Sequence, residues 1–162
     1  MTIHAAILTV SDSAVAGTRA DTSGPALAAH AAELGWTVAA TALVPDEEPA
    51  IAAKLREWSD AGYAVILTTG GTGLTVRDVT PEATRSVLDR EIPGIAELMR
   101  TRGLEQTKLA VLSRGLAGQR QQSLIVNLPG SPRGAIFSLQ AIAHLIPHIV
   151  DLLHGRTEHA GS

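Results

Sequence analysis

Apolar residues in this chain form short continuous runs that alternate with stretches of helical periodicity. The runs contain few polar residues, which is typical of strands covered on both faces of a sheet. Between the runs, apolar residues recur at i, i+4 and i+7, as Ile51, Leu55 and Trp58 do, and this spacing indicates amphipathic helices. The pattern predicts strands over residues 3–10, 36–44, 63–69, 109–113 and 123–128.

Glycine and proline mark the ends of the predicted helices. Thr80, Pro81 and Glu82 give three agreeing signals for a helix start, namely an N-cap hydroxyl, a first-turn proline and a first-turn acid. The other helices are expected over residues 24–35, 48–62, 95–103 and 134–153, the last with a kink near Pro147. Residues 114–121 are expected to be a polar loop.

This alternation of strands and helices predicts the fold class. It is α/β, a three-layer α/β/α domain with a mostly parallel central sheet. No internal repeat, linker or low-complexity segment divides the chain. We therefore expect a single domain over residues 1–155 and a polar C-terminal tail over residues 156–162.

Composition then excludes several classes of protein. Among the 162 residues 45% are apolar but only 2% aromatic, so the core is aliphatic and lacks the stacking platforms of single-strand nucleic-acid binders. A net charge of -3 without a basic run gives no nucleic-acid surface and no polybasic membrane patch. Without cysteine, disulfides and thiolate zinc sites are excluded. We expect a cytoplasmic protein with no signal peptide and no apolar run near the roughly 20 residues of a membrane helix.

The most distinctive stretch is residues 67–82, where the third predicted strand turns into a helix. Gly70, Gly71 and Gly73 permit positive φ and leave backbone N–H groups unobstructed for phosphate oxygens, and Thr69 and Thr72 add hydroxyls. The stretch is not a P-loop, because no Gly-Lys-Ser/Thr follows at the required spacing. It also lacks the third glycine of a dinucleotide-binding fingerprint. A tight turn that needs glycine for packing alone is the alternative.

Three carboxylates follow predicted strands or precede a predicted helix. Asp12 and Asp46 come at the carboxyl ends of the first two strands, and Asp78 lies just before the helix start at Thr80. Open α/β sheets place ligands at that edge. Mg²⁺ takes one or two carboxylates together with phosphates and water. The sequence therefore indicates a magnesium–nucleotide site, although the helix dipole alone would also favour Asp78.

Arginines and serines in the neighbouring loops are further candidates for contacts with phosphate. Each of them is ordinary when taken singly, since most such residues are surface charges or structural hydroxyls. His144 and His148 are spaced i, i+4 but straddle Pro147, so we interpret them as structural histidines rather than metal ligands. The candidates expected at the ligand edge are Arg77, Arg114, Arg120, Ser113, Ser123 and Ser131.

Two adjacent motifs carry a resemblance to a known family. They are Thr69-Gly70-Gly71-Thr72-Gly73 and Arg77-Asp78-Val79-Thr80-Pro81-Glu82-Ala83, and residues 10–12, 44–46, 112–114 and 127–132 agree in order. Over residues 3–153 the sequence resembles the molybdenum-cofactor biosynthesis proteins of the MogA/MoaB type, whose plant and animal relatives are the G domains of Cnx and gephyrin. Val76 departs from the proline found in many of the adenylyltransferases.

The resemblance implies a molybdopterin-binding domain that adenylylates molybdopterin with Mg-ATP and releases pyrophosphate. It implies that Asp78 and Asp46 are the essential acids, and these would hold Mg²⁺. It also implies a homo-oligomer, a trimer or a dimer of trimers, and a handover to a molybdenum-insertion protein. The expected substrate- and nucleotide-binding residues are Ser11, Asp12, Thr69, Gly70, Gly71, Thr72, Gly73, Ser113, Arg114, Pro129, Gly130 and Ser131.

Two other functions remain open at this point. A MoaB-type protein or a scaffold on the same fold would bind molybdopterin without catalysis, because a fold hosts a site independently of an activity. A generic nucleotide-binding α/β protein would bind no pterin at all.

Overall fold

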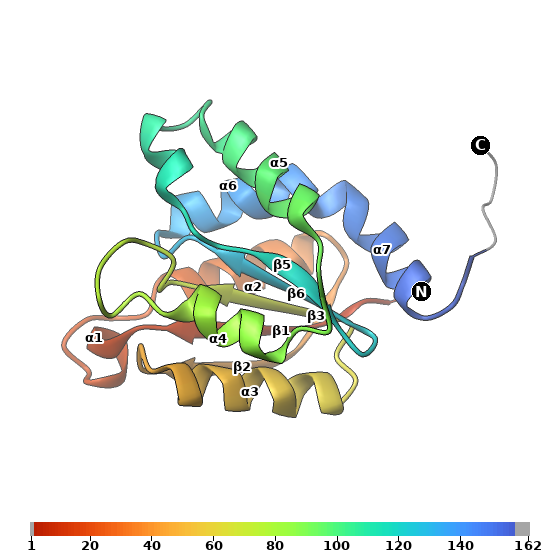
Figure 1. Cartoon of the computed structure of the whole chain (residues 1–162), viewed down its shortest axis with the longest axis horizontal. Helices are drawn as coiled ribbons and strands as arrows, with labels where there is room; N and C mark the ends of the chain where they lie inside the picture. The colour runs from red at the N-terminus through yellow and green to blue at the C-terminus, as the bar shows by residue number, and fades with distance from the viewer. Residues whose placement is uncertain (1, 158–162) are drawn as a thin grey trace.

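A six-stranded sheet crosses the middle of the molecule between two layers of helices (Figure 1). The computed structural model describes residues 2–157. The sheet order is β2-β1-β3-β6-β5-β4, in which β2, β1, β3 and β6 pair in parallel and β5 pairs antiparallel with both β6 and β4. This confirms the predicted fold class. The strands are β1 (His4–Val10), β2 (Thr37–Val44), β3 (Val65–Thr69), β4 (Arg90–Glu91), β5 (Ala117–Arg120) and β6 (Ser123–Leu128).

The helices divide into two layers. One layer consists of α3 (Glu48–Asp60), at the bottom of Figure 1, and α4 (Thr80–Val87), drawn in front of the strands. The opposite layer consists of α2 (Ser23–Glu33), α5 (Pro93–Gly103), α6 (Pro132–Ile142) and α7 (Ile146–Leu153). Three short elements complete the described chain, namely α1 (Asp12–Val15) and the 3₁₀ helices η1 (Lys108–Leu112) and η2 (Ala143–Leu145).

The core is aliphatic and lies on both faces of the three central strands. Every residue of β3 and β6 is buried, as their continuous apolar runs predict. Strand β2 differs, because it is an edge strand along which exposed residues alternate with partly covered ones. Burial therefore follows the position of a strand in the sheet as well as its composition.

Two predictions in the second half of the chain were wrong. Residues 109–113 were expected to be a strand, but residues 108–112 form η1, where Leu109 is 68% exposed and Val111 57% exposed. The expected polar loop 114–121 contains strand β5, which pairs with β6 through a tight hairpin at Gln121 (φ 51°). Backbone pairing with a buried neighbour creates β5, and this does not depend on an apolar side-chain pattern.

The last helical stretch breaks just before the proline that was expected to kink it. Pro147 lies in the first turn of α7, and η2 ends two residues before it. The proline ring clashes with the carbonyl four residues back, at Ala143, so the change of geometry falls on the N-terminal side of Pro147.

The stretch Pro132–Leu153 is 22 residues long and contains an 18-residue window with a mean hydropathy of 1.6, so by length and composition it could cross a membrane. The expectation that no apolar run approaches this length was therefore wrong. One such stretch is weak evidence of a membrane span, since core helices pass the same test. Here Leu139, Ile142 and Ile146 are buried in the core.

The first tail residue is attached to the domain. Arg156 donates from Nε to Asp151 Oδ1 at 2.9 Å and from its backbone N to the Asp151 carbonyl at 2.8 Å. Residues 158–162 of the predicted tail lie outside the described residues.

Candidate functional site

The carboxyl ends of the parallel strands meet at one edge of the sheet, at the left in Figure 1. The segments that follow β1, β2, β3 and β6 lie there, and they carry the predicted carboxylates and the Gly-rich loop. Arg120 and Ser123 were expected at this edge and lie elsewhere. Arg120 pairs with Ser123, the first residue of β6, so both are at the opposite end of the sheet.

The Gly-rich loop, residues 70–79, is fixed mainly through its carbonyl groups. The Gly70 carbonyl accepts from Thr80 Oγ1 at 3.0 Å, and the Gly71 carbonyl accepts from Thr80 N at 3.1 Å. Thr80 is fully buried, so these bonds tie the loop to the start of α4. The Thr72 carbonyl accepts from Arg114 N at 2.9 Å.

This arrangement leaves the amides of the loop for a ligand. In the described part of the chain, the backbone N–H groups of Gly71, Thr72 and Gly73 donate to no protein acceptor. Gly70 and Gly71 adopt φ values of 102° and 68°, and a Cβ at Gly71 would lie 2.2 Å from Thr80 Oγ1. Glycine is therefore required by the backbone conformation and by the close packing. Successive free amides beside positive-φ residues form a concavity suited to anions.

Asp78 is held inside the same loop. Its Oδ2 accepts from Thr75 N at 3.0 Å and from Thr75 Oγ1 at 2.8 Å. A Cβ at Gly73 would lie 2.8 Å from that oxygen, so the carboxylate lies directly against the glycine backbone. Asp78 is thus placed beside the free amides, with Oδ1 not used by any protein donor among the described residues.

Asp46 is fixed by the loop that follows β1. Asp46 Oδ2 accepts from Asp12 N at 2.8 Å, and Asp12 Oδ1 accepts from Asp46 N at 2.9 Å. Arg77 then donates through Nε and Nη2 to the Asp12 carboxylate, each at 2.9 Å. Both carboxylate oxygens of Asp12 therefore accept hydrogen bonds from the protein. Asp46 Oδ1 instead lies close to Gly71, since a Cβ added to Gly71 would be 3.1 Å from it.

The two neighbouring aspartates have opposite pKa shifts. Burial raises the pKa of Asp46 above its ordinary value, and the negative charges of Asp12 and Asp78 add to this rise against the hydrogen bond from Asp12 N. The hydrogen bonds from Arg77 and from Asp46 N lower the pKa of Asp12. These surroundings therefore disfavour the ionised form of Asp46, and a cation bound there would stabilise it.

The acids fit a magnesium ion that is shared with phosphate ligands. The described residues contain no group of three or more His, Cys, Asp or Glu side chains that could hold a metal alone. Asp46 and Asp78 lie against the glycine backbone of the same short loop, and each keeps one carboxylate oxygen that no donor among residues 2–157 uses. Hard oxygen ligands in this number suit Mg²⁺, which usually completes its shell with phosphates and water.

Arg114 binds the protein rather than pointing freely into the site. Its Nε donates to the Gly73 carbonyl at 2.8 Å, its Nη2 donates to the Asp78 carbonyl at 2.7 Å, and its Nη1 donates to Glu82 Oε1. The Arg114 bond lowers the pKa of Glu82 below its ordinary value. Glu82 entered the sequence analysis as a helix-start signal and as part of a family motif, and no local pattern revealed its ion pair with a residue 32 positions away.

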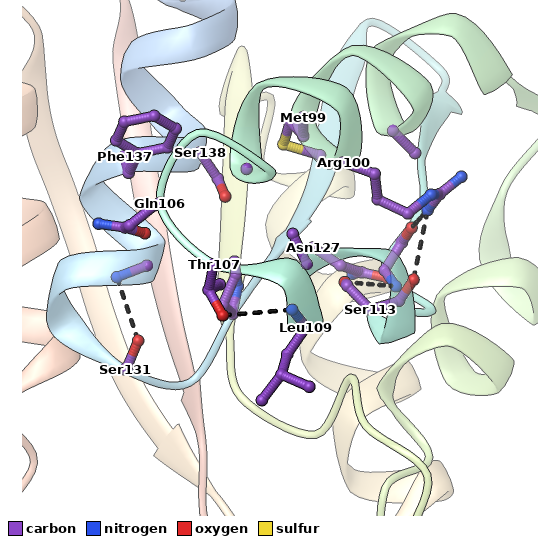
Figure 2. A pocket seen from close by; sticks show the side chains of 16 residues that line it. Met99, Arg100, Gln106, Thr107, Leu109, Ser113, Asn127, Ser131, Phe137 and Ser138 are labelled. Carbon is purple, nitrogen blue, oxygen red and sulfur yellow. Dashed lines mark hydrogen bonds between the residues drawn. The ribbon is translucent and has the colours of Figure 1, made fainter.

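A cavity of about 190 Å³ opens between α5, η1 and α6 (Figure 2). Its lining combines the apolar Met99 and Phe137 with the polar Ser113 and Ser131 (Figure 2). The predicted residues Ser113, Pro129 and Ser131 line it, and so does the buried Asn127.

A second, more polar cavity of about 360 Å³ lies between the loop after β1 and the start of α6. Five predicted residues line it, and one of them, Ser131, also lines the first cavity. The two cavities therefore adjoin at the start of α6. The other four residues are Ser11, Thr69, Gly70 and Gly130.

Comparisons with known proteins agree on one family. Residues 6–148 match the model described as "Probable molybdopterin binding domain". The molybdenum cofactor synthesis protein cinnamon of Drosophila melanogaster is 44% identical over 152 residues, which are 91% of this chain and 25% of the fly protein. The molybdopterin adenylyltransferase of Helicobacter pylori strain J99 is 41% identical over 157 residues, which are 95% of this chain and 89% of that protein. The crystal structure of the molybdopterin biosynthesis enzyme MoaB from Thermus thermophilus is 53% identical, with a TM-score of 0.90, covering 95% of this chain and 98% of that one.

Proposed function

We propose that this chain, which belongs to the molybdopterin binding domain family, is a molybdopterin adenylyltransferase. It would transfer AMP from ATP to the phosphate of molybdopterin and release pyrophosphate. A relative with that name is 41% identical, and this chain spans 89% of it. The observation that carries the proposal is the convergence of three free loop amides with Asp46 and Asp78.

The chemistry asks mainly for positioning. An oxygen of the molybdopterin phosphate attacks the α-phosphorus of ATP, a new P–O bond forms, and the bond from the α-phosphorus to the bridging oxygen breaks as pyrophosphate leaves. A phosphate monoester is largely ionised near neutral pH, so no general base is required. Catalysis then comes from in-line alignment and from stabilisation of charge on the phosphate oxygens.

Different residues would bind the phosphates, hold the metal ion and orient the carboxylates. The amides of Gly71, Thr72 and Gly73 would donate to the ATP phosphates, and Asp46 and Asp78 would hold Mg²⁺ on those phosphates. When bound, Mg²⁺ supplies positive charge that neutralises the phosphate oxygens. Thr75 keeps the Asp78 carboxylate oriented through two hydrogen bonds, and Asp12 does the same for Asp46 through one.

The apolar cavity is the proposed pterin site. A flat heterocycle needs an apolar surface with a few polar groups that fix its orientation, and Met99, Phe137, Ser113 and Ser131 supply this combination (Figure 2). The polar cavity lined by Ser11, Thr69, Gly70 and Gly130 adjoins it and is proposed for the more polar part of the substrates.

The proposal extends to properties that the family resemblance implies. The protein is expected to be cytoplasmic, to form a trimer or a dimer of trimers, and to pass its product to a molybdenum-insertion protein. Exposed apolar side chains on η1, among them Leu109, Val111 and Leu112, are available for contacts between subunits. Sedimentation of the purified protein tests the oligomeric state.

The second candidate function is a MoaB-type protein that binds molybdopterin without catalysis and would share this fold. The solved MoaB structure at 53% identity is named a molybdopterin biosynthesis enzyme, so its name does not select the non-catalytic alternative. That alternative predicts tight pterin binding with no turnover. A generic nucleotide-binding protein predicts no pterin binding, so copurification of a fluorescent pterin would count heavily against that reading.

The deciding experiment is incubation of the purified protein with molybdopterin, ATP and Mg²⁺, followed by detection of pyrophosphate. We expect pyrophosphate release that depends on molybdopterin and on Mg²⁺. Omission of the pterin is the control. ATP consumption that is independent of the pterin would contradict the assignment, and pterin binding without pyrophosphate would select the non-catalytic alternative.

A further inference from the structure

Arg114 and Glu82 make a set of contacts that the proposed reaction does not itself require. The guanidinium reaches the carbonyls at the two ends of residues 73–78, at 2.8 Å to Gly73 and 2.7 Å to Asp78. The third contact is an ion pair with Glu82 in the first turn of α4. One side chain thus connects both ends of the segment that carries Asp78 to the helix that follows it.

We infer that Arg114 and Glu82 form a positioning pair, which holds residues 73–78 so that Asp78 and the loop amides face the ATP phosphates. This inference rests on the proposed function. The guanidinium engages the carbonyl side of the loop, so the amides are presented on the other side. The backbone of residue 114 adds a fourth contact, from its N–H to the Thr72 carbonyl at 2.9 Å.

Arginine is required for this geometry. Its planar fork has donors in three directions, and here each nitrogen reaches a different acceptor. A lysine at the same position has a single nitrogen, which cannot meet three acceptors in that arrangement. Glu82 in turn fixes the orientation of the fork, and its Oε2 is buried without a hydrogen-bond partner in the described part of the chain. Glu82 is therefore committed to Arg114.

The inference separates two roles for Arg114. The sequence predicts that Arg114 binds substrate, for which direct contact with the molybdopterin phosphate is needed. A positioning residue acts instead through the placement of Asp78. Loss of a direct contact raises KM for molybdopterin, whereas loss of positioning lowers kcat and leaves that KM nearly unchanged.

The test compares Arg114→Lys and Glu82→Gln with the control Arg120→Lys. Arg120 is a matched control because it also bonds three groups: Ser59 Oγ at 2.8 Å, the Val87 carbonyl at 3.1 Å and Asp60 at 3.6 Å. It lies at the opposite end of the sheet. The measurements are kcat and KM for each substrate, the Tm, and hydrogen exchange of the amides of residues 78, 80 and 114.

We expect Arg114→Lys to lower kcat on the order of 10- to 100-fold, because small misplacements of a catalytic group have effects of this size. Its KM for molybdopterin should stay within about two-fold. Glu82→Gln should act in the same direction with a smaller effect. Arg120→Lys should lower Tm comparably and leave kcat unchanged. The hydrogen-exchange rates of the amides of residues 78 and 114 should rise in Arg114→Lys and Glu82→Gln but not in Arg120→Lys.

Three results would overturn the inference. One is a large rise in KM for molybdopterin in Arg114→Lys with normal kinetics in Glu82→Gln, which assigns Arg114 to direct substrate contact. Another is an equal loss of kcat in Arg120→Lys, which makes the effect one of general stability. The third is unchanged loop exchange in both Arg114→Lys and Glu82→Gln. Because exchange needs no turnover, it tests the pair even if the wild-type protein proves to have no transferase activity.

Discussion

The two segments that carry the candidate acids are built in opposite ways. Asp46 follows β2, and its carboxylate and backbone N–H bond reciprocally with the backbone N–H and carboxylate of Asp12, a residue 34 positions away that follows β1. Asp78 is held by Thr75 within its own loop. Burial and like charges raise the pKa of Asp46. The comparison indicates that Asp46 depends on strand neighbours for its position, whereas Asp78 depends on the conformation of one loop.

The largest expected effect comes from removing either charge. Asp78→Asn and Asp46→Asn should each lower adenylyl transfer by at least about 10²- to 10³-fold, because charge stabilisation on the phosphates is lost. Pterin binding should survive in both variants, since the proposed pterin cavity is lined by other residues. Pyrophosphate release and pterin fluorescence measure the two properties separately.

Asp89→Asn is the matched control for this pair. Asp89 Oδ2 also accepts a backbone N–H, from Gln121 at 2.7 Å, but it is exposed and distant from the carboxyl ends of the parallel strands. Turnover of Asp89→Asn should equal that of the wild type. Unchanged turnover in Asp78→Asn would remove the role given to Asp78.

The next effect concerns the loop backbone alone. Gly71→Ala should destabilise the fold by more than the about 1–2 kcal/mol expected for a left-handed non-glycine residue, because its Cβ would also clash with Thr80 Oγ1. Gly62→Ala is the control for conformation, since Gly62 has φ 86° with nothing within 4 Å of a Cβ. Denaturant unfolding of both variants measures the difference. Equal losses would show that the close approach at Gly71 is not important.

The raised pKa of Asp46 predicts a smaller effect, on the pH dependence of Mg²⁺ binding. In the proposed site, Mg²⁺ would bind the ionised form of Asp46, whose raised pKa should make the affinity decline on the acid side at a higher pH than for an ordinary aspartate. Asp12→Asn removes a neighbouring negative charge and keeps an oxygen that accepts from Asp46 N. The acid limb of Mg²⁺ binding should therefore move to lower pH. Calorimetric titration with Mg²⁺ and pyrophosphate across the acid range checks the direction, and a shift to higher pH would contradict it.

The smallest predicted effect concerns stability in acid. The pKa of Glu82 is lowered by Arg114, so the pair stabilises the fold fully above the ordinary pKa of 4.5 and loses this contribution as the pH falls through the lowered value. Glu82→Gln should reduce Tm near neutral pH, and its difference from the wild type should shrink below about pH 4.5. Thermal unfolding at several pH values measures this, and a difference independent of pH would show that charge is not involved.

Much of the fold followed from local pattern, and the exceptions have physical causes. The apolar runs of β1, β3 and β6 predicted the central strands because these strands are buried on both faces. The run at residues 109–113 was misread, since an exposed apolar segment such as η1 has the composition of a buried strand. Strand β5 had no such run and exists because β6 offers it a backbone partner.

For the site, the sequence by itself determined the Gly-rich turn, the start of α4 to within one residue and the acids after the strands. Each of these depends on backbone geometry within a few residues, and residue type therefore predicts it. The expected N-cap Thr80 is the first helical residue, Val79 is the N-cap, and the Thr80 hydroxyl donates to the Gly70 carbonyl instead.

Only the tertiary structure decided which groups face the loop. The Asp12–Arg77 pair and the Arg114–Glu82 pair join residues 65 and 32 positions apart, and Arg120 was carried to the opposite end of the sheet. Such partners are set by strand order and direction, which bring distant segments together without leaving a local pattern in the chain.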